Sequence, residues 1–139
     1  MSRIVELWRQ GEVPGFSGLY RANGSARSVE VDGAALTYFR VGEPFDVAGR
    51  LAEDPDHVAE IDESARAALP DGGSVVCGEG ALGSQGFFAR LDASDGLIWV
   101  VYLSNGNPFH ELGLDGSRAT FTNNHGRSIT VDLTDDLYA

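Results

Sequence analysis

The stretch that most constrains this chain is Leu97–Leu103, which contains seven consecutive apolar or aromatic residues. Turn-forming residues bound it on both sides, at Ser94–Gly96 and at Ser104–Pro108. An apolar run of this length between two turns predicts a β-strand that is buried on both faces. Such a strand lies in the middle of a sheet, with a neighbour at each edge and a layer of structure over each face. We therefore expect the rest of the chain to supply those neighbours and layers.

Three segments are predicted as helices that cover mainly one face of the sheet. Residues 2–10 begin with a serine that can cap a helix and end before a glycine. Residues 44–53 begin with a proline and repeat apolar side chains at helical spacing. Residues 55–69 start at the Asp54-Pro55 pair, show the same spacing, and are stopped by Pro70–Gly73.

The other segments predict antiparallel strands joined by short turns. An Asp-Gly pair separates residues 27–31 from residues 35–41, which predicts a hairpin. Residues 117–122 and 128–133 alternate apolar and polar side chains, so each of these strands should have one buried and one exposed face. We expect one α+β domain over residues 1–139, with an antiparallel sheet of about six or seven strands. The sheet consists of the N-terminal hairpin and a C-terminal meander, with two or three helices mainly on one face.

The charge of the chain indicates which partners it attracts. It has 21 acidic and 10 basic residues, a formal net charge of −11 with neutral histidines. Such a field repels nucleic-acid phosphates and anionic membranes and attracts cationic proteins. All ten basic residues are arginine, a bias that a GC-rich bacterial coding sequence explains. We expect a basic protein partner, and neither nucleic acid nor membrane as a ligand.

Cysteine usage and the N-terminal sequence favour a cytoplasmic location. The single cysteine, Cys77, excludes an intramolecular disulfide and suits a reducing compartment. The first ten residues lack a signal-peptide pattern, and no apolar run approaches the roughly 18 residues that span a bilayer.

No known catalytic or metal-binding motif is present. The glycine-rich loop Gly78–Gln85 lacks the Lys-Ser/Thr ending of a phosphate-binding loop and reads as a hairpin connection. The three histidines, His57, His110 and His125, are too dispersed to form a recognisable metal site. Cys77 lies in an apolar predicted strand, where burial makes a thiol inert. We therefore expect no catalytic residues, no metal and no cofactor.

One candidate binding surface is an acidic face on the predicted helix 55–69. Asp56, Glu60 and Glu63 recur at i, i+4 and i+7, which places them on one side of a helix. A partner-binding face would use these carboxylates for docking. Acidic residues in the first half of a helix are also favoured by the helix dipole, so the pattern has a structural explanation as well.

A second candidate surface is formed by two turns of the C-terminal meander, whose alternate loops fall at the same end of the sheet. Loops that combine amide, imidazole and aromatic side chains are suitable for recognition. Asparagine is also favoured in turns because it tolerates left-handed backbone. The candidate residues are Asn105, Asn107, Phe109, His110, Asn123, Asn124 and His125.

In layout this chain resembles bacterial toxin-immunity proteins, which are small, acidic, single-domain, rich in β-structure and free of a catalytic signature. The resemblance implies that carboxylates steer the protein onto the basic active site of a toxin and that aromatic side chains fix the complex. Two alternatives remain open. One is a small-ligand-binding protein or enzyme whose pocket, between sheet and helices, brings Cys77, a histidine and a carboxylate together. The other is an acidic adaptor or regulatory module.

Overall fold

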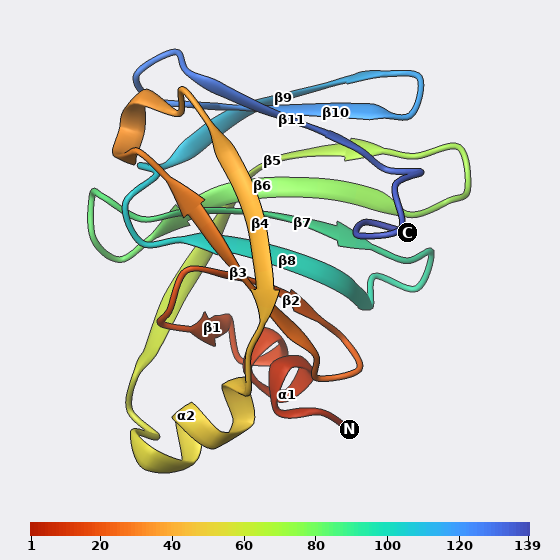
Figure 1. Cartoon of the computed structure of the whole chain (residues 1–139). Coiled ribbons are helices and arrows are strands. Elements are labelled where there is room, and N and C mark those ends of the chain that lie inside the picture. The colour runs from red at the N-terminus through yellow and green to blue at the C-terminus, as the bar shows by residue number, and fades with distance from the viewer.

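Eleven strands in two antiparallel sheets form most of the protein, in a computed structural model that describes all 139 residues (Figure 1). Two α-helices and one short 3-10 helix complete it. In chain order the elements are α1 (Arg3–Arg9), β1 (Glu12–Pro14), β2 (Gly18–Arg21), β3 (Ala26–Val31), η1 (Gly33–Ala35), β4 (Phe39–Pro44), α2 (Val47–Glu53), β5 (Val58–Ala68), β6 (Ser74–Gly80), β7 (Gly86–Leu91), β8 (Leu97–Leu103), β9 (Phe109–Asp115), β10 (Arg118–Asn123) and β11 (Ser128–Asp132).

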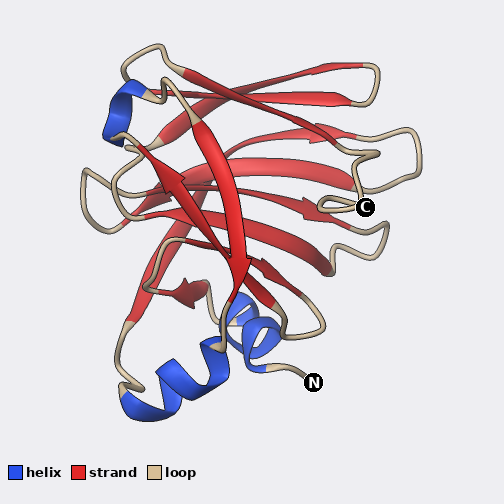
Figure 2. Cartoon of the chain, in the orientation of Figure 1, coloured by secondary structure: helices blue, strands red, loops and turns tan.

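The elements are stacked in three layers. The large sheet has the strand order β1-β5-β6-β7-β8-β2-β3-β4, and the small sheet has the order β11-β10-β9. The small sheet covers one face of the large sheet, where Phe88 of β7 stacks on Phe121 of β10 with ring centroids 4.4 Å apart. The helices lie on the other face (Figure 2), where Leu7 of α1 and Leu51 of α2 join a second core with Phe87. The prediction of helices mainly on one face is confirmed for α1 and α2.

The central strand is confirmed as β8. It pairs with β7 on one edge and with β2 on the other, and six of its seven residues are buried. Trp99 and Val101 point into the core between the sheets, while Val100 and Tyr102 point into the core beneath the helices. Each fully buried side chain of this size stabilises the fold by about 1.5–3 kcal/mol. No helix is both long and apolar enough to cross a membrane.

The predicted helix 55–69 is wrong, because most of this segment forms β5, the longest strand. A β-bulge interrupts its pairing with β6 between Glu63 and Ala65. Before the bulge, alternate residues face the helix-side core, and after it Ala65 packs against the core between the sheets. Two alternating segments offset by one residue reproduce an apolar spacing that resembles a helix. The predicted count of about six or seven strands in one sheet is also wrong, because the eleven strands form an eight-stranded sheet and a separate three-stranded sheet of β9, β10 and β11.

Three boundaries differ more modestly. Strands β3 and β4 pair as the predicted hairpin, but β4 starts only at Phe39 because η1 and Leu36, with a φ of 48°, occupy the connection. Helix α2 starts at Val47, where the Asp46 side chain accepts a hydrogen bond from the Gly49 N–H at 3.0 Å. The predicted helix 2–10 is confirmed as α1, and the capping serine accepts a bond from the helix backbone at 3.2 Å.

Candidate functional site

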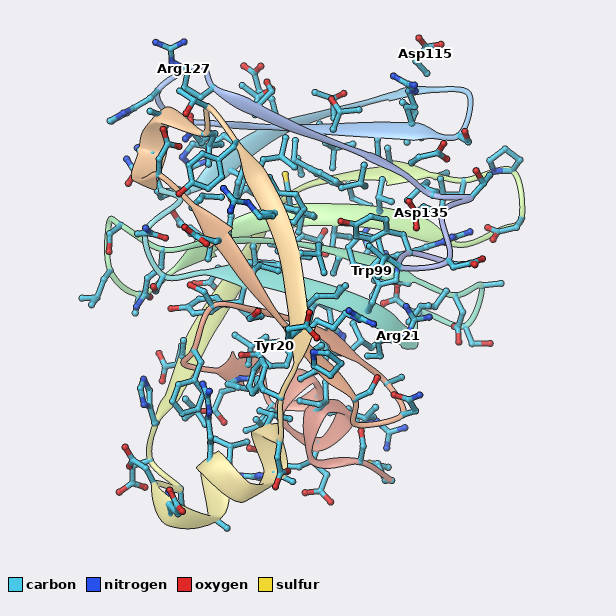
Figure 3. The ribbon with its side chains drawn as sticks, in the orientation of Figure 1. Tyr20, Arg21, Trp99, Asp115, Arg127 and Asp135 are labelled. Carbon is cyan, nitrogen blue, oxygen red and sulfur yellow. The ribbon has the colours of Figure 1, made fainter.

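Four connections gather at one end of the molecule, on the left in Figure 1: the segment around η1 and the β6–β7, β8–β9 and β10–β11 loops. We call this the loop end. Arg127 marks it in Figure 3, and Asp115 marks the opposite end. The backbone N–H of Asn107 donates to the carbonyl oxygen of Ser84 at 2.9 Å and thereby joins two of these loops. The meander therefore places its alternate loops together, as the sequence predicted.

Asn123 holds the loop end together from inside. Its amide nitrogen donates to the carbonyl oxygens of Ala34 at 2.8 Å and Gly106 at 3.0 Å. Its side-chain oxygen accepts hydrogen bonds from the backbone N–H groups of His125 and Arg127, both at 3.0 Å. The residue is 4% exposed. Asn123 therefore fixes three loops and is not available to a partner.

The exposed part of the loop end is a connected group of polar side chains. The amide nitrogen of Asn107 lies 3.2 Å from Oδ1 of Asn124 and 3.2 Å from Nε2 of His125. Asn107 has a φ of 64°, a left-handed conformation that asparagine tolerates better than most residues. Asn105 and His110 are exposed on either side of it along the chain. Five of the predicted contact residues thus lie at this end: Asn105, Asn107, His110, Asn124 and His125.

Phe109 is the exception, because it belongs to the core. Its ring is 0% exposed and packs edge-on against Phe88 with centroids 5.6 Å apart. Strand alternation sends Phe109 inward and the next residue, His110, outward. The prediction that Phe109 contacts a partner is therefore wrong.

The structure adds an exposed apolar side chain that sequence reasoning did not select. Leu82, in the β6–β7 loop, is 64% exposed. Its loop is bonded to the β8–β9 loop through Ser84. A leucine among the glycines of a hairpin loop is a signal that could have identified it, since such a loop has no core to bury it.

A row of four carboxylates crosses strands β1, β5 and β6 on one face of the large sheet. Glu12 lies directly opposite Glu60, and Asp62 lies directly opposite Glu79. Glu60 and Asp62 are two residues apart, so their side chains point to the same face. None of the four forms an ion pair. We call Glu12, Glu60, Asp62 and Glu79 the acidic row.

The acidic row begins at the loop end. Glu79 is the cross-strand partner of Gly86, so both positions face the same side of the sheet. A Cβ added at Gly86 would overlap the carbonyl oxygen of Asn107, which shows that the β8–β9 loop lies directly over this position. A hollow of about 460 Å³, lined in part by Glu12, Glu60 and Asp62, continues the row away from the loops. The acidic row therefore extends from this hollow to a position beside the β8–β9 loop.

The predicted acidic face of Asp56, Glu60 and Glu63 does not exist, because the segment is not a helix. Asp56 lies in the turn before β5. Glu63 faces the opposite side of the sheet from Glu60 and binds Arg66 through two hydrogen bonds of 2.7 and 3.1 Å. Arg66 also bonds Asp95 at 2.7 Å. Of the three predicted acids, only Glu60 belongs to the acidic row.

The residues considered for chemistry stay apart. Cys77 is fully buried, as predicted; burial raises the pKa of its thiol to about 12, and it lines no pocket. His57 packs on Phe16 with ring centroids 4.1 Å apart. No three histidine, cysteine or acidic side chains come together in a way that could hold a metal ion. The Cys77–His–carboxylate group considered from the sequence is therefore not assembled.

No family model, curated protein or solved structure matches this chain. The geometry of its own surface is thus the basis for assigning a function.

Proposed function

We propose that this protein is a non-catalytic inhibitor that binds a basic protein through the acidic row and the adjoining loop end. A bacterial toxin domain whose active site it occludes is the partner that this chemistry fits best, which makes the chain an immunity protein. The observation that carries the proposal is the placement of carboxylates directly opposite one another without any cation between them.

Such pairs are unfavourable in the free protein. Like charges opposite each other on antiparallel strands destabilise a sheet by a few tenths to about 1 kcal/mol per pair. Residues that break a local rule of stability in this way are typical of functional surfaces. A partner that brings arginine or lysine side chains onto the row turns the same charges into favourable contacts. The net charge of −11 would also accelerate the encounter.

The loop end supplies what the acidic row lacks. Leu82 offers apolar area for a partner pocket, and the exposed Asn105, Asn124 and His125 of the other loops at this end offer hydrogen-bonding groups. This combination of an apolar contact with a polar rim is the usual anatomy of a protein interface. Because Asn123 fixes the loops in advance, binding would order few additional groups, which favours affinity.

The test is capture from the native lysate with tagged wild-type protein, first at low salt and then at about 0.5 M salt, where screening of exposed charges is strong. The captured protein is identified, purified and assayed for its own activity at an equimolar ratio. The variant Glu60→Gln/Asp62→Asn removes the centre of the row. The variant Glu43→Gln/Glu53→Gln removes the same charge from exposed positions outside it.

The proposal predicts capture of one basic protein whose activity is lost in the complex, with capture reduced only by the acidic-row variant. A partner that keeps its activity would indicate the adaptor function instead. Equal capture by both variants would exclude the acidic row as the binding surface.

A further inference from the structure

A small hollow with an apolar lining lies beside α1, on the helix side of the large sheet. We call it the apolar hollow, and its volume is about 230 Å³. It is lined by the buried side chains of Val76, Phe87 and Leu91 and by the half-buried side chains of Trp8 and Ile61. Its volume is below the range of about 300–1,000 Å³ that is usual for small-molecule sites. The apolar hollow therefore suits a single side chain of a partner better than a separate small ligand.

The rim of the apolar hollow carries more negative than positive charge. Its charged lining residues are Glu63, Arg66 and Asp95, and all three are exposed. The two carboxylates share the guanidinium group of Arg66, each at 2.7 Å. Two negative charges against one positive charge leave the rim with a net charge of −1. A basic group beside the hollow is therefore favoured over an acidic one.

The apolar hollow opens at the same edge of the sheet as the acidic row. Helix α1 and strand β1 lie together at this edge (Figure 1). Strand β1 pairs only with residues 58–60 of β5, and β5 continues beyond them with β6 as its one neighbour. Gly11 and Ile61 line both the apolar hollow and the hollow along the acidic row. A partner bound to the acidic row is thus one strand edge away from the apolar hollow.

We infer that the basic partner inserts one apolar side chain, flanked in its own sequence by arginine or lysine, into the apolar hollow. The inserted side chain removes apolar surface of Trp8 from water, while the flanking cations lie near Glu63, Asp95 and the acidic row. An apolar anchor inside a charged rim is typical of the contacts that dominate binding energy. A second copy of this chain does not fit, because its net charge of −11 would bring carboxylates against carboxylates. This inference rests on the proposed function, since it names the part of the basic partner that docks.

The test is an NMR titration of the nitrogen-15-labelled full chain with the capped tripeptide Arg-Leu-Arg. Two control peptides each change one feature: Arg-Gly-Arg lacks the apolar side chain, and Glu-Leu-Glu reverses the charge. The two indole N–H signals locate the binding. Trp8 lines the apolar hollow, whereas the Trp99 indole is buried and donates to the carbonyl oxygen of Tyr138 at 2.9 Å.

Two double variants test the charged rim. Glu63→Gln/Asp95→Asn removes both carboxylates and keeps the shapes of the side chains. Asparagine also tolerates the left-handed backbone of position 95, where φ is 66°. The matched control, Glu43→Gln/Glu53→Gln, removes the same charge from exposed positions outside the hollow.

We expect weak, saturable binding of Arg-Leu-Arg with shifts at the Trp8 indole and at residues 61–66, and no shift at the Trp99 indole. Arg-Gly-Arg and Glu-Leu-Glu should each bind at least about fivefold more weakly, because one loses apolar burial and the other loses charge attraction. The rim variant should weaken the binding of Arg-Leu-Arg at least about fourfold, and the matched control should change it less than about twofold.

Absence of saturable binding, equal affinity for Arg-Gly-Arg, equal affinity of the rim variant, or shifts confined to residues outside the apolar hollow would each overturn the inference. The titration uses no captured protein. It can therefore fail while inhibition of a captured basic partner still supports the proposed function, and the two failures are distinguishable.

Discussion

Removing one carboxylate from the acidic row should make the free protein more stable. Glu60→Gln preserves the shape of the side chain and removes the charge directly opposite Glu12. Opposed side chains on antiparallel strands have Cβ atoms about 4.5–5.5 Å apart. Two unit charges at about 5 Å in water repel each other by roughly 0.8 kcal/mol. Because Asp62 on the same face adds a weaker repulsion, we expect a gain of about 0.5–1 kcal/mol in the free energy of unfolding at low salt.

Salt provides the decisive control for this prediction. The Debye length falls from about 10 Å at 0.1 M to about 3 Å at 1 M ionic strength, so the gain should shrink severalfold at 1 M. Urea denaturation of the wild type and of Glu60→Gln at both salt concentrations measures it. Glu43→Gln removes an exposed carboxylate of β4 that has no acidic residue as its cross-strand partner, and it should give a clearly smaller gain. An unchanged or lower stability of Glu60→Gln, or a gain that persists at 1 M, would refute the electrostatic argument.

Three further results are expected. Asn107→Ala should lower the free energy of unfolding by about 1–2 kcal/mol in urea denaturation, because it removes the hydrogen bonds that join two loops and places alanine in a left-handed backbone conformation that it adopts poorly. The control Asn105→Ala should change the free energy of unfolding by less than about 0.5 kcal/mol. Cys77 should resist a thiol reagent at pH 8 in the folded protein and react once urea is added, since burial raises its pKa to about 12; rapid labelling without urea would contradict its burial. The hydroxyl of Thr134 donates to Asp132 and lowers the pKa of that carboxyl, so its stabilisation is present above the unfolded pKa and is lost as the pH falls through the lower folded value. The stability difference between wild type and Asp132→Asn should therefore shrink between pH 6 and pH 2, and a constant difference in urea midpoints would contradict this assignment.

The central strand was predictable because its signal is local. Leu97–Leu103 is apolar at every position and bounded by turns, so no other element satisfies the pattern, and burial on both faces requires a place in the middle of a sheet. The N-terminal cap of α1 was equally predictable, since a serine just before an amphipathic helical segment is favoured as the residue whose side chain accepts a hydrogen bond from the helix backbone.

The identity of β5 was not predictable from the same kind of pattern. Its alanines favour a helix, the Asp-Pro pair before it resembles a helix start, and the bulge between Glu63 and Ala65 breaks the alternation that identifies a strand. Pairing with β1 and β6 outweighs these local preferences. Strand pairing depends on the whole fold, so the 11 residues of β5 alone do not reveal it.

The candidate surface was predictable only in part. Topology was sufficient to place the two asparagine-rich loops at one end. Both Phe109 and His110 were predicted as contact residues, but only His110 is exposed, because the alternation of β9 turns Phe109 into the core. The acidic row could not be predicted from the sequence, because Asp62 and Glu79 become neighbours only through the register of β5 on β6. A shift of that register by one residue would separate them.

The most direct test of this account is the rate and affinity with which the captured basic partner binds wild type, Glu60→Gln/Asp62→Asn and Glu43→Gln/Glu53→Gln, measured by surface plasmon resonance at low salt. The account predicts that the acidic-row variant is more stable than the wild type yet binds at least about tenfold more weakly, with much of the loss in the association rate. The matched control should bind within about threefold of the wild type, because it changes the net charge without changing the row. Equal affinity of the acidic-row variant and the wild type would contradict the claim that these opposed carboxylates exist to bind a cationic protein.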